Sequence, residues 1–112
     1  MKVALLDSTI REGEQSPNVS FSVEQKIEIV KALDDFGVEF IELGHPAVSP
    51  DIREAIANIS GIETRAKKVI HCRATRSDID LAISLNIPWI GIFFGTSDLS
   101  LKHKFGIDRQ SA

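Results

Sequence analysis

The first fifteen residues combine a short apolar run with a dense cluster of charge: VALL at residues 3–6, then DSTIREGEQ at residues 7–15. The apolar run is typical of a strand that is buried on both faces. Charged side chains held this close together are costly unless they bind one another, a metal or an anionic substrate. A solvated loop is the simpler interpretation. The cluster, however, follows the first strand, where parallel α/β folds place their chemistry.

The rest of the chain alternates between predicted helices and strands. Apolar runs predict further strands at residues 38–43, 68–72 and 87–94. Three helices are expected between the strands, with the N-caps Ser22 (capping box with Gln25), Ser49, and Thr75 or Ser77. Gly37 and Gly61 end the first two helices, and the third is expected to bury Ile79, Ala82 and Ile83. Residues 98–112 show no period and are expected to form an irregular tail.

Each predicted strand ends in a polar cluster. The clusters are Arg11 with Glu12, Glu42 with His45, His71 with Arg73, and Thr96 with Ser97. This placement suits the C-terminal rim of a TIM barrel, so residues 1–112 are predicted to be a single α/β domain. That domain would be the N-terminal half, about four βα units, of a (β/α)₈ barrel. A flavodoxin-like sheet fits the element order, but it would normally carry a glycine-rich phosphate loop after the first strand.

Composition excludes several classes of protein. The chain has 112 residues, 43% of them hydrophobic, and a net charge of −3. Its lysines and arginines are scattered, so no nucleic-acid partner is expected. No apolar run could span a bilayer and the N-terminus lacks a signal-peptide layout, which predicts no membrane association and a cytoplasmic location. Cys72 is the single cysteine, so no internal disulfide is expected.

The charged stretch resembles the signature of a known enzyme family. DSTIREGEQ is similar to the motif of the acetyl-CoA-dependent Claisen-condensing enzymes, which include homocitrate, isopropylmalate and citramalate synthases on metal-dependent TIM barrels. The resemblance continues through residues 22–50 (SVEQKIEIVKALDDFGVEFIELGHPAVSP) and into FFGTS at residues 93–97. Glutamate after Arg11, together with FGTS, is more similar to homocitrate synthase than to isopropylmalate synthase.

The resemblance implies a condensation of acetyl-CoA with a 2-oxo acid, 2-oxoglutarate being favoured, and it implies roles for particular residues. Arg11 corresponds to a catalytic, substrate-binding arginine that neutralises the oxygen of the 2-oxo acid. Glu12 corresponds to a ligand of a divalent metal (Mg, Mn or Zn), and Gln15 to a substrate-binding glutamine. Glu42 corresponds to the carboxylate that holds the arginine, and His71 to a catalytic histidine that faces the substrate.

Other side chains have simpler interpretations. Cys72 is expected to be a small core residue, since neighbours on a strand point to opposite faces and it cannot share a ligand with His71. Trp89 is expected to pack in the core or against a helix. His45 precedes a proline in a loop, where a histidine is more often solvated than ligating.

Two features of the resemblance have no counterpart in these 112 residues. The family's metal site also uses a His-x-His pair from a later strand. Homocitrate synthases of the lysine pathway commonly carry an acidic residue on the fourth strand, where Gly91 or its neighbours stand here. A full barrel takes roughly 250 residues, so four strands leave open edges. A synthase fragment or half-barrel is favoured, partnered in a homo-oligomer or by a separate C-terminal half. A binding or regulatory module without catalysis is the alternative.

Overall fold

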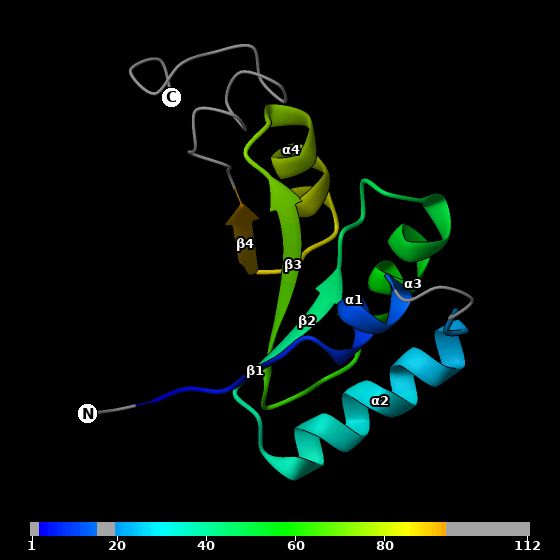
Figure 1. Ribbon diagram of the computed structural model, residues 1–112, viewed down its shortest axis with the longest axis vertical. Helices are drawn as coiled ribbons and strands as arrows, with labels where there is room; N and C mark the ends of the chain where they lie inside the picture. Colours follow the sequence, from blue (N-terminus) through cyan, green and yellow to red (C-terminus); the bar gives the residue numbers. More distant parts are fainter. Residues whose placement is uncertain (1–2, 16–19, 94–112) are drawn as a thin grey trace.

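The fold, seen in a computed structural model that describes residues 3–15 and 20–93, is one parallel sheet with helices in its connections (Figure 1). The elements are β1 (Leu6–Asp7), α1 (Thr9–Glu14), α2 (Val23–Phe36), β2 (Phe40–Gly44), α3 (Pro50–Ser60), β3 (Lys67–Arg73), α4 (Arg76–Ser84) and β4 (Trp89–Phe93). The strands are all parallel and lie in the order β1-β2-β3-β4. This arrangement confirms the predicted α/β class and the partial TIM barrel.

Local sequence signals set the helix boundaries. The Ser22 side chain accepts a hydrogen bond from the Gln25 amide, and the Gln25 side chain accepts one from the Ser22 amide. The Ser49 side chain accepts from the Ile52 amide at the start of α3, and the Thr75 side chain accepts from the Asp78 amide at the start of α4. Thr75 rather than Ser77 is therefore the third N-cap. Gly37 ends α2 with a φ of +103°, a left-handed conformation that glycine adopts without steric cost.

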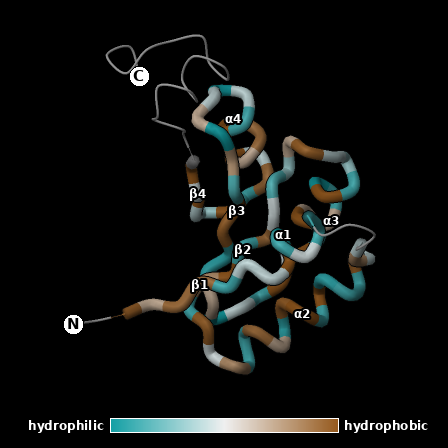
Figure 2. The backbone as a smooth tube through the Cα atoms, viewed as in Figure 1, coloured by the Kyte–Doolittle hydropathy of each residue, from teal (hydrophilic) through white to brown (hydrophobic). Residues whose placement is uncertain are grey.

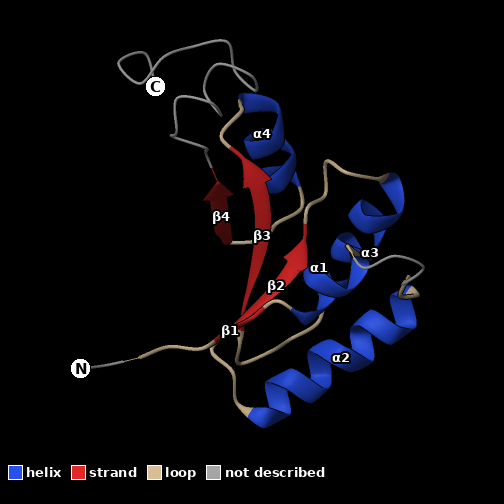
Figure 3. Cartoon of the chain, viewed as in Figure 1, coloured by secondary structure: helices blue, strands red, loops and turns tan. Residues whose placement is uncertain are grey.

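The core lies between the sheet and its helices. Helices α1, α2 and α3 lie on one side of the sheet (Figure 3), and hydrophobic residues of the strands and helices alternate with polar ones along the chain (Figure 2). Val30 of α2, Ile56 and Ile59 of α3, and Ile41 and Ile70 of the strands have at most 1% of their surface exposed. The apolar sides of α2 and α3 therefore join the strands in one continuous core.

The prediction that the first strand is buried on both faces is wrong for the described residues. Leu5 and Leu6 are 58% and 53% exposed, and Val3 is 69% exposed. The strand pairs only through Leu6 and Asp7 with β2, so it lies at an edge of the sheet. Burial on both faces requires elements packed over each face of the strand, which the described residues do not supply.

Two further expectations need correction. Residues 9–14, for which a solvated loop was the simpler interpretation, form the six-residue helix α1. Ile10 is fully buried and anchors this helix in the core. Ile83 is 62% exposed, although it was expected to be buried. The buried residues of helix α4 are instead Asp78 and Ala82, and Asp78 accepts hydrogen bonds from the backbone and side chain of Arg73.

Some expectations fall on residues outside the described part of the chain. These are the end of the fourth strand at Phe94, the polar cluster of Thr96 and Ser97, and the tail of residues 98–112. Within the described residues, no helix is long and apolar enough to cross a membrane.

Candidate active site at the carboxyl ends of the strands

Arg11 and Glu42 form a part-buried ion pair at the carboxyl ends of β1 and β2. The Arg11 Nε donates to Glu42 Oε1 at 2.8 Å. Glu42 is 6% exposed, and its carboxylate would be costly to bury without this partner. Because α1 places Arg11 above the end of β2, the guanidinium is held in one orientation rather than sampling solvent. A fixed guanidinium is suited to binding a carboxylate or an oxyanion.

His71 joins the same carboxylate from the neighbouring strand β3. Its Nδ1 lies 3.0 Å from Glu42 Oε1, the oxygen that also accepts from Arg11. Contact with a carboxylate places the proton on Nδ1. Desolvation lowers the pKa of His71; the negative charge of Glu42 opposes this effect, and the positive charge of Arg11 adds to it. Glu42 therefore orients the imidazole, and desolvation favours its neutral form.

Glu12 is the most solvent-accessible member of the cluster. Its side chain is 58% exposed, and Oε1 accepts from Arg11 Nη2 at 2.9 Å. A carboxylate oxygen is a suitable ligand for a hard divalent cation, so Glu12 fits one position of a metal site. Among the described residues, no group of three or more His, Cys, Asp or Glu side chains could hold a metal. The cluster thus supplies one ligand, and a complete site would need others.

Gln15 ends α1 and lies close to the arginine. Together with Arg11 and His45 it lines a small cavity of about 80 Å³ between α1 and the end of β2. The structure therefore brings four of the five predicted site residues, Arg11, Glu12, Glu42 and His71, into one bonded cluster, with Gln15 at its border. Their catalytic and binding roles stay predictions.

His45 is not the solvated loop residue that its sequence context suggested. Its side chain is 16% exposed, and its Nε2 lies 3.1 Å from Asp78 Oδ2. Asp78 is 2% exposed and also accepts hydrogen bonds from the backbone and side chain of Arg73. The guanidinium of Arg73 holds the pKa of Asp78 far below its usual range, so this carboxylate is ionised. Asp78 thereby ties together the ends of β2, β3 and the start of α4.

The two remaining interpretations have different outcomes. Cys72 is fully buried beside Ile70, which confirms it as a core residue, and burial raises the pKa of its thiol. Trp89 is 44% exposed on the edge strand and packs edge-on against Phe40 at 5.3 Å between ring centroids. Its expected burial in the core or against a helix is therefore only partial, because β4 is an edge of the described sheet.

Sequence reasoning missed two buried charged residues near the site. Asp78 occupies the third position of a helix capped by Thr75, which aims its carboxylate back toward the preceding strand. Lys26 is 3% exposed and lies on the apolar stripe of α2, three residues after Val23 and four before Val30. The helical spacing places Lys26 on the buried side of α2, and a lysine is buried there only when it has a partner of opposite charge. The spacing could therefore have predicted a buried ion pair.

The four parallel strands and their helices define a partial TIM barrel, and its polar residues gather at the end of the strands where such barrels place their sites. More particularly, the chain belongs to the HMGL-like family, whose model matches residues 2–112. It is 52% identical over its full length to a homocitrate synthase of Saccharolobus islandicus, and 51% identical to that of Saccharolobus solfataricus. A homocitrate synthase of Sulfurisphaera tokodaii is 48% identical over the full chain. The chain spans a quarter of the length of these relatives.

Proposed function

We propose that this chain supplies one part of the active site of a homocitrate synthase-type acyltransferase, which condenses acetyl-CoA with a 2-oxo acid, 2-oxoglutarate being favoured. The observation that carries the proposal is the Arg11–Glu42 ion pair of 2.8 Å, built from the motif shared with that family. A buried carboxylate that orients a part-exposed arginine at the barrel rim prepares a fixed positive charge for an anionic substrate. The full-length similarity to homocitrate synthases supports the choice of reaction.

In this proposal each residue of the cluster has one task. Arg11 binds the oxygen and carboxylate of the 2-oxo acid and stabilises the negative charge that develops during condensation. Glu42 holds Arg11 and His71 in place, and Gln15 donates a hydrogen bond to the substrate. His71, whose Nδ1 proton is directed at Glu42, presents Nε2 to the substrate as a hydrogen-bond acceptor. Glu12 would be one ligand of a divalent cation, whose contribution when bound is to polarise the substrate carbonyl.

The chain spans a quarter of its relatives, so the remaining parts of the site would come from elsewhere. We propose that they come from a separate C-terminal half or from another copy in a homo-oligomer. The exposed apolar residues of the edge strands, Leu6 on β1 and Ile92 on β4, support such an association. The cytoplasmic location stays a prediction.

A complementation experiment tests the proposal. The Saccharolobus solfataricus homocitrate synthase would be produced without its first quarter and mixed with this chain, acetyl-CoA, 2-oxoglutarate and Mg²⁺ or Mn²⁺. Release of the CoA thiol, measured with a thiol reagent, is expected from the mixture and from neither part alone. The Arg11→Ala chain should give no release. Turnover that persisted with Arg11→Ala would refute the central assignment.

The same assay separates the alternatives. Replacing 2-oxoglutarate by 2-oxoisovalerate or pyruvate distinguishes the homocitrate reaction from those of isopropylmalate and citramalate synthases. A non-catalytic binding module is the second candidate, because Arg11, held by Glu42, can bind an anionic partner without a metal. If the two parts associate in gel filtration and release no thiol with any of the three oxo acids, the binding module replaces the enzyme.

A further inference from the structure

Helix α1 carries Arg11 and Glu12 but is too short to hold its own orientation. It has six residues, and helices of this length are unstable in water without tertiary contacts. Ile10 anchors one side of it in the core. At Gly13, an added Cβ would lie 2.5 Å from Phe21, so the start of the next segment packs directly against the helix. The third contact involves charge and comes from α2.

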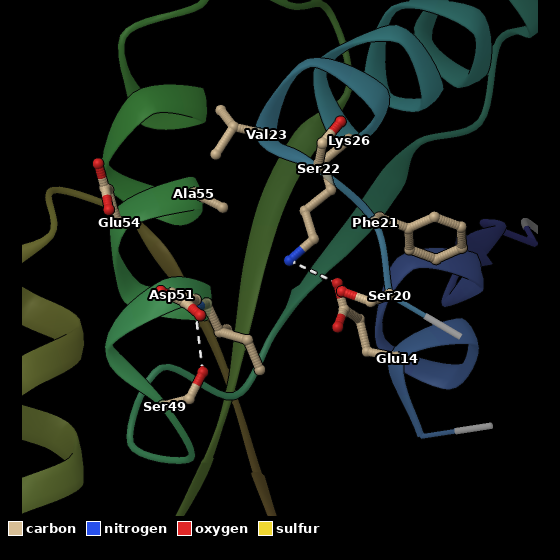
Figure 4. Close-up of a pocket in the computed structure, with 11 residues that line it drawn as sticks. Glu14, Ser20, Phe21, Ser22, Val23, Lys26, Ser49, Asp51, Glu54 and Ala55 are labelled. Atoms are coloured by element: carbon tan, nitrogen blue, oxygen red, sulfur yellow. Dashed lines mark hydrogen bonds and ion pairs between the residues drawn. The ribbon is translucent and has the colours of Figure 1, made fainter. Parts of the chain in front are cut away.

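Lys26 reaches from α2 to the end of α1 and meets Glu14 there. Figure 4 shows the lysine pointing from its helix toward that carboxylate. Lys26 Nζ lies 2.7 Å from Glu14 Oε1, and the two side chains are 4% and 18% exposed. The contact has the distance of an ion pair without the geometry of a hydrogen bond. The pair is therefore held by charge, and neither group reaches bulk water easily.

We propose that Lys26 is a positioning residue for Arg11, acting through Glu14. Arg11 and Glu14 are three residues apart, so they lie one turn apart on the same side of α1. Glu42 fixes the first of them to β2 and Lys26 fixes the second to α2, so the two ion pairs together set the rotation of the helix. Lys26, Glu14 and Arg11 also line the same cavity of about 80 Å³. The importance of Arg11 for turnover rests on the proposed function.

Removing the ammonium group of Lys26 should change the hydrogen bonding of Arg11, and not only the free energy of unfolding of the whole chain. Without Lys26, Glu14 is left as an unpaired and largely buried carboxylate, which is strongly unfavourable. The least costly response is for the carboxylate to turn toward solvent, and α1 must rotate with it. That rotation draws the Arg11 Nε away from Glu42 and weakens their hydrogen bond.

The Nε–H signal of Arg11 in a ¹⁵N-labelled sample of the full chain measures this effect without any substrate. The Arg11→Lys variant identifies the signal. In Lys26→Met the Arg11 Nε–H should exchange with solvent about tenfold faster or more, as expected when a charge-assisted bond opens locally. Lys26→Arg, which keeps the charge, should stay within about twofold of the original chain. Lys68→Met is the matched control, because Lys68 is also part-buried but donates to the backbone carbonyls of Ile59, Ser60 and Ile62, at the end of α3 and just beyond it.

The outcomes are distinct. A faster Arg11 exchange in Lys26→Met but not in Lys68→Met supports the positioning role. Equal Arg11 signals in the two variants would overturn it and leave Lys26 as a purely structural residue. If Lys26→Met does not fold, Glu14→Gln tests the same link from the other side and should give the same change at Arg11. Failure of the complementation assay would refute the proposed function and would leave this measurement unaffected.

Discussion

Replacing Glu42 by glutamine removes the charge at the centre of the rim cluster while keeping its shape. Glu42 is 6% exposed and accepts from Arg11 at 2.8 Å and from His71 at 3.0 Å. Hydrogen bonds to charged groups contribute about 1.5–3 kcal/mol each. The two bonds share one oxygen and are not additive, and Arg11 is 20% exposed, so it can turn partly to water. We expect the free energy of unfolding to fall by about 2–3 kcal/mol.

Urea unfolding followed by the fluorescence of the single tryptophan, Trp89, measures this change. With a slope of about 1.5 kcal/mol per M, the midpoint should move down by about 1–2 M. Glu39→Gln is the control, since this exposed glutamate lies just before β2 and its loss should change stability by less than about 0.5 kcal/mol. A midpoint for Glu42→Gln equal to that of the control would refute the view that the cluster is a mutually stabilised unit.

Three other perturbations test the same structure. Asp78 has a lowered pKa because Arg73 donates hydrogen bonds to it. Its contribution to stability is therefore complete above the unfolded value of about 3.9 and is lost as the pH falls below that value. Asp78→Asn should flatten the stability profile between about pH 4 and about pH 2 in urea titrations, and an unchanged slope would contradict this. Gly37→Ala should lower the free energy of unfolding by about 1 kcal/mol, because φ is +103° at this residue. Gly61→Ala should leave it unchanged, because φ is −82° there. Equal thermal midpoints for the two variants would contradict this prediction. Leu6→Lys on the exposed edge strand should convert the proposed homo-oligomer to a monomer in light scattering, and an unchanged mass would exclude this edge as the contact.

Local chemistry explains which parts of the fold could be predicted. The capping box at Ser22, the cap at Ser49 and the stop at Gly37 are interactions within a few residues, so they can be read from spacing alone. The pairing of Arg11 with Glu42, in contrast, joins residues that are 31 positions apart in the chain. It was expected from the resemblance to the synthase family, and it fits the position of both residues near the carboxyl ends of parallel strands, which lie at one edge of a sheet.

The sequence by itself determined the strand and helix order, the α/β class and the identity of the rim residues, because periodicity and capping act locally. Only the tertiary structure decided that the charged motif forms a helix, that Leu5 and Leu6 are exposed at an edge, and that His45 is bonded rather than solvated. It also decided that Asp78 and Lys26 are buried with partners from other elements. The physical reason is that the cost of burying a charge depends on a partner that lies far away in the chain, which no local pattern can specify.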